Sequence, residues 1–392
     1  MDGKTLEYPA QINALTSIRY LAAAWVVLFH LKEFTHAIPL REAPIVLFGY
    51  LGVDFFFVLS GFVLTHVYKS QVDQARFDYW SFIAKRLGRI YPMHLFTLAL
   101  FLVLGVISAL AGLEYEIWNP GYPFEHLERG VLIRALMAHV TLIHAWGATP
   151  GLLFNLPSWS ISAEWFAYLM FPVFMLLFRI ARGSAGVKLA LAIALFLGMA
   201  TATAGLMDLQ LTKMSWNIGI LRIVPEFMLG VALYQFGVGW SAGRRGARTG
   251  LIASVLVAVA GVYLGALSPG LEVPGATLAV MGMAFVVFFA ADCERHGIFP
   301  VLSNPFLVLL GEISYSVYMI HLLVAICVFE LLLPGFRPDN TGVALGAIAL
   351  VLAATTVLSW ITYRLVEIPG RRLIVSVAMS LNRPSAPRAT QP

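Results

Sequence analysis

The sequence predicts an all-α integral membrane protein of about ten transmembrane helices, and three observations lead to this fold. Hydrophobic residues make up 59% of the chain and charged residues only 12%, whereas about a quarter of the residues of a soluble domain are charged. Apolar stretches of about 20 residues, the length that crosses a bilayer as a helix, recur from end to end. The connections between them are short, so one membrane domain is expected over residues 1–381.

Eleven apolar segments are candidates for spans, and ten of them are expected to cross. The eleventh, Val131–Trp146, holds one arginine and two histidines and is expected to re-enter or lie at the interface. Excluding it places the basic clusters Arg179–Lys188 and Arg244–Arg248 in the cytoplasm together with both termini. The ten expected spans are Ala14–Lys32, Pro44–Tyr68, Ile90–Leu113, Pro157–Phe178, Val187–Met207, Gly219–Phe236, Gly250–Leu267, Pro274–Ala291, Phe306–Leu333 and Gly342–Leu365.

The charge and the chain ends exclude several other classes. The net charge of +5 comes from basic residues that gather in particular loops, as topology requires, and does not indicate a nucleic-acid partner. Cys293 and Cys327 have no spacing typical of a disulfide framework or a metal site. The first apolar helix has no small-residue cleavage site and is expected to be retained as a span. The tail of residues 382–392 contains three prolines and is expected to be disordered in the cytoplasm.

The first span, SIRYLAAAWVVLFHL, carries two polar residues on nearly the same face. Arg19 and His30 are eleven residues apart, which returns to almost the same helix face after a rise of about 16 Å. Arg19 is expected near the cytoplasmic end and His30 in the outer half. Snorkelling of Arg19 and simple packing of His30 are the alternatives to a functional pair.

The second span and the loop after it add further polar groups. Asp54 and Ser60 lie in the apolar run GVDFFFVLSGF, where a lone carboxylate needs a partner or water. Arg86 and Arg89, in KRLGRIYP, share one face of a helix end and are predicted either to set the topology or to bind phosphates.

Later spans contain intramembrane acids and a polar helix face. Glu164 lies about 10 Å below the outer end of its span. Glu226 lies four residues after Arg222, so an intrahelical ion pair is its simpler interpretation. The stretch GEISYSVYMIHLL places Tyr315 and His321 in a span, either as contacts between helices or as site residues.

The depths of three of these residues suggest one polar site. By helix rise, His30, Glu164 and Glu226 fall within about one helical turn of the same level in the outer half. A site in this region is therefore expected to include all three.

These segments, in this order, resemble the acyltransferase-3 family of bacterial membrane O-acyltransferases. The resemblance extends from residue 17 to residue 372, and the spacing of ten residues between arginine and histidine followed by FFFVLSGF is its specific part. The stretches that carry it are SIRYLAAAWVVLFH, GVDFFFVLSGFVL, RLGRIYP, PSWSISAEWFAYL, RIVPEFMLG, GEISYSVYMIHLL and YRLVEIPGRR.

The resemblance implies an enzyme of the bacterial cytoplasmic (inner) membrane that transfers acetyl or related groups. The donor it implies is cytoplasmic acyl-CoA, a co-substrate rather than a bound cofactor, and the acceptor is an extracytoplasmic glycan or a small molecule. It implies that Arg19 and His30 are the essential pair and that Arg86 and Arg89 belong to the donor-binding region. Glu164 matches the acid that follows W-S in the family.

The chain departs from many relatives in two places. Where they have two acids after W-S, this chain has ISAEWFAY, with one. A soluble hydrolase-like domain, which many relatives append, is not expected here.

The chemistry expected from these positions is general-base catalysis. His30 would deprotonate the acceptor hydroxyl and Glu164 would orient the imidazole. Direct transfer and a covalent acyl-enzyme on Ser60 or His30 both remain open. A secondary transporter or a flippase is the alternative class, because such proteins also bury charges near the midplane. Residues expected to bind substrate are Arg86, Arg89, Asp54, Ser60, Tyr315, His321 and Glu226.

Overall fold

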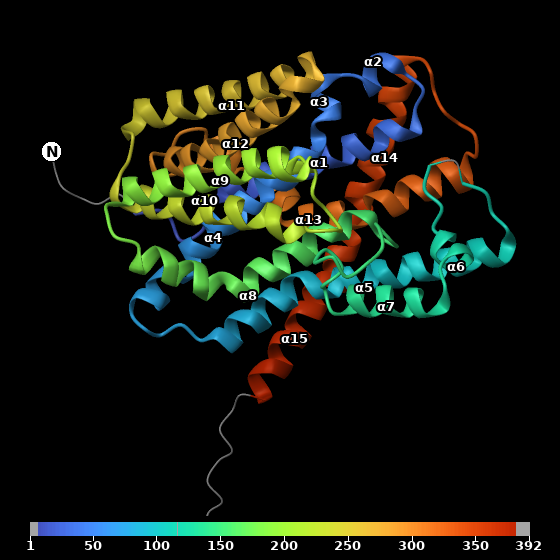
Figure 1. Cartoon of the computed structure of the whole chain (residues 1–392), viewed down its shortest axis with the longest axis horizontal. Coiled ribbons are helices and arrows are strands. Elements are labelled where there is room, and N and C mark those ends of the chain that lie inside the picture. Colours follow the sequence, from blue (N-terminus) through green and yellow to red (C-terminus); the bar gives the residue numbers. More distant parts are fainter. Residues whose placement is uncertain (1–6, 116, 382–392) are drawn as a thin grey trace, which may run out of the picture.

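The computed structural model describes residues 7–115 and 117–381, and within these ranges all regular structure is helical (Figure 1). Ten helices are long and apolar enough to cross a membrane, which confirms the predicted fold class. They are α1 (Asn13–Leu31), α4 (Gly52–Asp73), α5 (Tyr79–Ala111), α8 (Trp159–Ile180), α9 (Ala185–Met207), α10 (Gly219–Gly239), α11 (Gly243–Leu267), α12 (Glu272–Arg295), α13 (Pro305–Ile326) and α14 (Thr341–Thr362), which continues through a wider turn (Tyr363–Glu367) into α15 (Ile368–Leu381). Four short helices lie in the connections: α2 (Ile38–Arg41), α3 (Pro44–Leu47), α6 (Tyr122–His126) and α7 (Arg129–Val140).

The basic loops lie at one end of the bundle, which we call the inner end; the opposite end is the outer end. An even number of spans brings the start of α1 and the end of α14 to the same, inner end. The short helix α7 has 12 residues, which cover about 18 Å and so fall short of a 30 Å core. The segment from Val131 is therefore not among the spans, as the charge pattern predicts. The tail of residues 382–392, for which disorder is expected, lies outside the described residues.

Two helices extend well past their predicted bounds. Helix α5 begins at Tyr79 rather than Ile90, because Asp78 caps it by accepting hydrogen bonds from the backbone N–H groups of Trp80 and Ser81. Helix α15 projects beyond the other helices (Figure 1). The start of α5 contains the charged residues Lys85, Arg86 and Arg89, and the start of α15 contains Arg371 and Arg372, so the hydropathy pattern ends both spans early.

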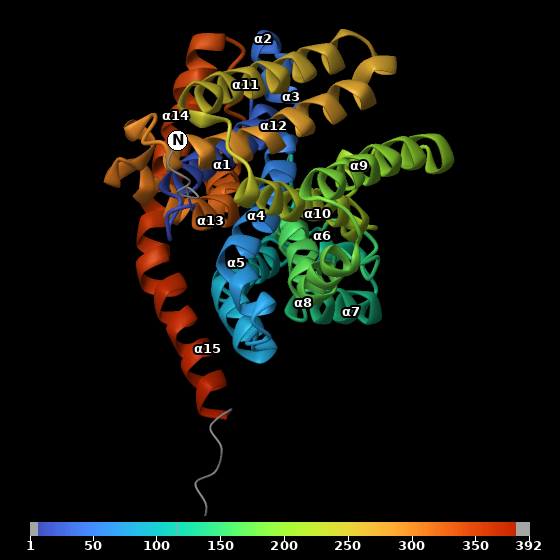
Figure 2. The same ribbon diagram turned by 90° about the vertical axis from the view of Figure 1, so that its left-hand side faces the viewer.

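Helix α4 occupies the centre of the bundle, with α1, α10 and α13 around it (Figure 2). Small residues permit a close approach of α4 and α10. A Cβ on Gly61 would lie 2.0 Å from the carbonyl oxygen of Phe227, and one on Gly230 would lie 2.0 Å from that of Val58. Because these backbones touch, α4 and α10 hold a fixed register that positions the side chains between them.

Helix α7 is fixed at the outer end by three buried histidines with stacked rings. The ring centroids of His139 and His144 are 4.0 Å apart. His94 on α5 donates from Nε2 to the carbonyl oxygen of His139 (2.8 Å), and His144 contacts the carbonyl oxygen of Ser158 at 3.0 Å. Burial lowers the pKa of His139 to about 4, so this side chain is neutral near pH 7. The segment between α6 and α8 is thus anchored to the protein through its histidines, while Ile133 and Met137 on the other face of α7 are exposed.

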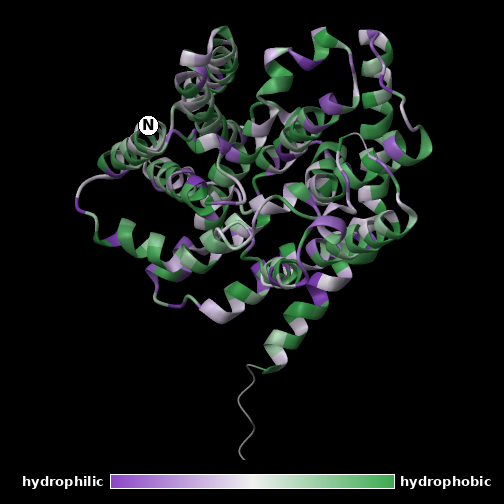
Figure 3. Cartoon of the chain, turned by 45° about the vertical axis from the view of Figure 1, so that its right-hand side comes forward, coloured by the Kyte–Doolittle hydropathy of each residue, from purple (hydrophilic) through white to green (hydrophobic). Residues whose placement is uncertain are grey.

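Hydrophobic residues line the long helices, and hydrophilic residues concentrate in the connections, with some inside the bundle (Figure 3). This distribution is that of a protein whose outer surface faces lipid.

The orientation predicts which loops a membrane-impermeant reagent reaches. In a background with Cys293→Ala and Cys327→Ala, a cysteine replacing the exposed Glu128 should be labelled by an impermeant maleimide in intact cells. A cysteine replacing the exposed Arg245 should be labelled only after permeabilisation. Labelling of both positions in intact cells would mean that α7 crosses the membrane.

Candidate active site

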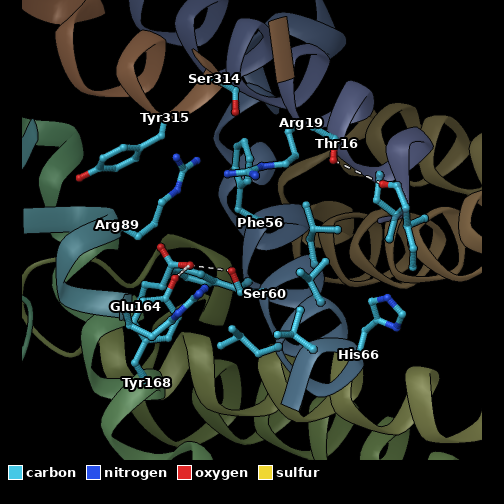
Figure 4. A pocket seen from close by; sticks show the side chains of 18 of the residues that line it. Thr16, Arg19, Phe56, Ser60, His66, Arg89, Glu164, Tyr168, Ser314 and Tyr315 are labelled. Atoms are coloured by element: carbon cyan, nitrogen blue, oxygen red, sulfur yellow. Dashed lines mark hydrogen bonds between the residues drawn. The ribbon is translucent and has the colours of Figure 1, made fainter. Parts of the chain in front are cut away.

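A cavity of about 270 Å³ opens at the inner end and rises between α1, α4, α5, α8 and α13 (Figure 4). We call it the inner cavity. Its lower walls include Gln11 and His66, and higher up it is lined by aromatic and aliphatic residues such as Phe56 and Ile161. The sequence-predicted site residues that line it are Arg19, Ser60, Arg86, Arg89, Glu164 and Tyr315.

The three arginines of the inner cavity differ in their partners. Arg89 forms an ion pair with the fully buried Glu367, whose second oxygen accepts from Ser316 (2.9 Å). Within the described ranges, neither Arg19 nor Arg86 donates a hydrogen bond to another residue, and Nε of Arg86 is buried without a partner. Two guanidinium groups thus face the cavity with their donors free, which is the arrangement that binds phosphate or carboxylate groups.

Glu164 also lines the inner cavity and accepts hydrogen bonds from two hydroxyl groups (Figure 4). Its Oε1 accepts from Ser60 Oγ at 2.6 Å and from the Tyr168 hydroxyl at 2.5 Å. The Ser60 hydroxyl therefore has a carboxylate as its acceptor, as a nucleophile with a base would. Tyr315, a further predicted site residue, donates its hydroxyl to the carbonyl oxygen of Ile90 (2.5 Å).

A second, larger cavity of about 700 Å³ lies at the outer end, and we call it the outer cavity. His30 lines it, together with the aromatic residues Phe29, Tyr50 and Trp159. The basic side chains in its wall are all paired with acids, in the ion pairs Lys32–Glu33, Lys213–Glu272 and Arg222–Asp54. The outer cavity thus presents little net charge, in contrast to the inner cavity.

His30 is hydrogen-bonded to His321, and the surrounding carbonyl groups determine which nitrogen of each ring carries the proton. His321 Nδ1 lies 2.7 Å from the carbonyl oxygen of Tyr318, so Nδ1 must be the donor and Nε2 carries a lone pair. His30 Nδ1 lies 3.0 Å from the Val26 carbonyl oxygen and 3.0 Å from His321 Nε2. Both are acceptors, so His30 Nδ1 carries the hydrogen and His30 Nε2 is left as a free base.

This tautomer assigns the orienting role to His321. When His30 Nε2 takes up a proton, its Nδ1–H remains bound to the lone pair of His321, which stabilises the imidazolium. The expected contact of Glu164 with His30 does not form among the described residues: Oε1 of Glu164 accepts from Ser60 and Tyr168, and Nδ1 of His30 contacts Val26 and His321. His30 and Glu164 line different cavities, since equal depth in two helices does not bring their side chains together.

Asp54 and Glu226, which were expected to bind substrate, lie away from the inner and outer cavities. Neither lines a cavity; both are fully buried between α4 and α10. Arg222 binds Asp54 through two hydrogen bonds, Nε–Oδ1 at 3.0 Å and Nη2–Oδ2 at 2.5 Å, so the predicted intrahelical pair with Glu226 does not form. Both carboxylate oxygens of Glu226 lack a hydrogen-bond partner in the described structure. The pair holds α4 against α10 and turns the Arg222 guanidinium toward the Trp159 ring, 5.0 Å away.

The inner and outer cavities share two lining residues, Val53 and Tyr318. Sequence reasoning did not assign either to the site. Tyr318 lies on the same helix face as His321, which was a usable signal, whereas Val53 is one valine in an apolar run and gives none. Arg222 was considered only as a local partner of Glu226.

Comparison with known proteins identifies the protein's class. A family model described as an acyltransferase domain matches residues 12–364, which extend from the start of α1 to beyond α14. The chain belongs to the acyltransferase-3 family. It is a multi-pass membrane enzyme that transfers an acyl group from a donor to an acceptor.

Several curated proteins are similar to this acyltransferase. Acyltransferase MdmB of Streptomyces mycarofaciens is 27% identical over 412 residues, covering 97% of this chain and 98% of its own. Regulator of hypoxia-inducible factor 1 of Caenorhabditis elegans is 24% identical and covers 81% of this chain and 71% of its own. Protein 2 in picA locus of Rhizobium radiobacter is 29% identical over 163 residues, 40% of this chain and 78% of its own. No solved structure matches the chain significantly.

The difference between Arg86 and Arg89 can be tested by comparing stability with donor binding. Arg89→Ala leaves the buried carboxylate of Glu367 without a cation, which costs about 3–5 kcal/mol, so the melting temperature of the purified protein should fall clearly. Arg86→Ala breaks no ion pair and should keep the melting temperature while raising the KM for an anionic acyl donor.

The double variant Arg89→Ala/Glu367→Gln is the control, because it removes the stranded charge and should recover much of the lost stability. Equal loss of stability in the Arg86 and Arg89 variants would contradict the assignment of different roles.

Proposed function

We propose that this acyltransferase moves an acyl group, acetyl or a related one, from cytoplasmic acyl-CoA to a hydroxyl of an extracytoplasmic glycan or related acceptor. The membrane would be the cytoplasmic (inner) membrane of a bacterium. The observation that carries the proposal is the pair of cavities: one opens at the inner end with unpaired cations, the other at the outer end with an available base, and both reach Val53 and Tyr318.

The inner cavity suits the donor. An acyl-CoA carries phosphates at one end and a thioester at the end of a thin, flexible arm. Arg19 and Arg86 offer free donors for the phosphates. The apolar upper wall around Phe56 and Ile161 suits the arm. Arg89 adds positive charge to the same region, although its guanidinium is already paired with Glu367.

The outer cavity suits a neutral acceptor. It is more than twice as large as the inner cavity, its wall is partly aromatic, and its basic residues are paired. A hydroxyl compound with little charge, such as a sugar residue, fits a cavity of this size and polarity and leaves no buried ion without a partner. The similarity to Acyltransferase MdmB over nearly the whole of both chains supports acyl transfer by the helical bundle itself.

The histidine pair supports direct transfer. His30 Nε2 takes the proton of the acceptor hydroxyl while the hydroxyl oxygen attacks the carbonyl carbon of the thioester. The tetrahedral intermediate then expels the CoA thiolate, which receives the proton from His30. A new ester bond has formed, the thioester bond has broken, and His30 returns to its starting tautomer. Ser60, bound to Glu164, is the residue that an alternative acyl-enzyme route would use; the transporter and flippase alternatives lose their basis because the chain belongs to an acyltransferase family.

A deletion strain tests the function. Mass spectrometry of its surface glycans and secreted small molecules should show the loss of one acyl mass, and the wild-type gene should restore it. A gene with His30→Gln should not restore it, because glutamine keeps a hydrogen bond but takes up no proton at neutral pH. Loss of a general base costs about 10²–10⁴ in rate.

Two further variants give the matched controls. His321→Gln still offers a hydrogen-bond acceptor to His30 and should lose less activity than His30→Gln. Ser60→Ala should keep most of the activity under direct transfer and none under an acyl-enzyme route. Restoration of the acyl mass by a correctly inserted His30→Gln protein would contradict the mechanism.

A further inference from the structure

The acyl group has to travel between the cavities before it can react. This step rests on the proposed function, in which the phosphates stay near Arg19 and Arg86 while His30 lies in the outer cavity. Reacting atoms must approach to about 3–3.5 Å. The thioester carbon therefore has to come out of the inner cavity and next to a hydroxyl at His30. The side chains that line both cavities, Val53 and Tyr318, lie on this route.

Tyr318 is held in place by four contacts. Its hydroxyl is within hydrogen-bond distance of the Pro157 carbonyl oxygen (2.9 Å) and of Ser160 Oγ (2.8 Å), both at the outer end of α8. Its ring packs edge-on against Phe56, with 6.4 Å between centroids. Its carbonyl oxygen accepts from His321. Rotation of the Tyr318 side chain out of the route would break both hydrogen bonds of its hydroxyl.

Val53 has little freedom to move either. It is 5% exposed on α4, and a β-branched side chain in a helix has one strongly preferred rotamer. The backbone beside it touches α1: a Cβ on Gly52 would lie 2.7 Å from Val26 Cγ2 and 2.8 Å from the carbonyl oxygen of Ala22. Helix α4 therefore cannot recede at this level, and the side chain of Val53 sets the width of the route on its side.

We propose that Val53 and Tyr318 form a passage that selects acyl groups by width rather than by length. The acyl group is the leading end of the arm, so it passes first. A straight acyl chain is no wider than the arm that follows, and any opening that admits the arm also admits the chain. A group branched next to the carbonyl is wider than a straight chain and than the two methylene groups that follow the sulfur in the arm, so it meets both side chains. Beyond the passage, the outer cavity of about 700 Å³ leaves room for length.

Two isomeric donors separate width from hydrophobicity. Butanoyl-CoA and 2-methylpropanoyl-CoA contain the same atoms, and only the second is branched next to the carbonyl. CoA thiol release by the purified protein can be measured for acetyl-CoA and both isomers, with glycerol as a small neutral hydroxyl acceptor. The wild type should use butanoyl-CoA at least about 10-fold better in kcat/KM, because one misplaced methyl group is worth about that factor in a tight apolar site.

Three valines supply matched variants. Val53→Ala should bring the two isomers to within about threefold of each other while the acetyl-CoA rate stays within about threefold of wild type. Val63→Ala removes the same atoms from the inner cavity alone, and Val26→Ala from the outer cavity alone; both should keep the wild-type ratio. Val53→Thr leaves the width of the side chain unchanged and should also keep the wild-type ratio of kcat/KM between the two isomers.

The outcomes distinguish failure of the passage from failure of the proposed function on which the passage rests. If the wild type releases no CoA from acetyl-CoA, the donor assignment fails and the passage fails with it. If acetyl-CoA is turned over but the wild type uses both isomers equally, or all three valine-to-alanine variants shift the ratio alike, the passage alone is overturned.

Discussion

Ionised side chains inside a bundle of apolar helices lose their water, and this cost constrains where charge occurs in the structure. Asp54 pairs with Arg222 across α4 and α10, and Glu367 pairs with Arg89 between the end of α14 and α5. Each pair joins helices that are far apart in the sequence. Removing one partner would leave a buried ion, at about 3–5 kcal/mol. These pairs fix the helices that form the walls of both cavities.

The groups that break this pattern are the ones suited to chemistry. Arg19 and Arg86 keep free donors at the inner cavity, where an anionic ligand would accept hydrogen bonds from their guanidinium groups. His30 and His321 meet a different requirement. The proposed reaction needs a base in a region where an ionised side chain costs free energy. As a neutral pair with defined tautomers, they place one unprotonated nitrogen at the outer cavity and hold a proton only while the reaction lasts.

The sequence predicted the number of spans, the short segment at the outer end, and many of the polar residues that line the two cavities, because hydropathy and charge act locally along the chain. Relations between helices were harder. The common face of Arg19 and His30 was deduced from helix geometry, but the rise between them brings one to each cavity. Glu164 was placed beside His30 because their depths agree, and depth does not say which way a side chain points. The rule for residues four apart favoured Arg222 with Glu226, whereas Asp54, 168 residues away, forms the pair. Val53 has no chemical signature, and only the shape of the cavities makes it notable.

The central claim is that the donor enters from the inner end and presents its acyl group to His30 beyond Val53 and Tyr318. An experimental structure of the protein with S-ethyl-CoA, an unreactive thioether analogue of acetyl-CoA, tests it most directly. The phosphates should lie against Arg19 and Arg86 in the inner cavity, and the ethyl group should lie past Val53 and Tyr318 next to His30 Nε2. An analogue whose phosphates occupy the outer cavity, or whose ethyl group stops beside Ser60 and Glu164, would contradict the account.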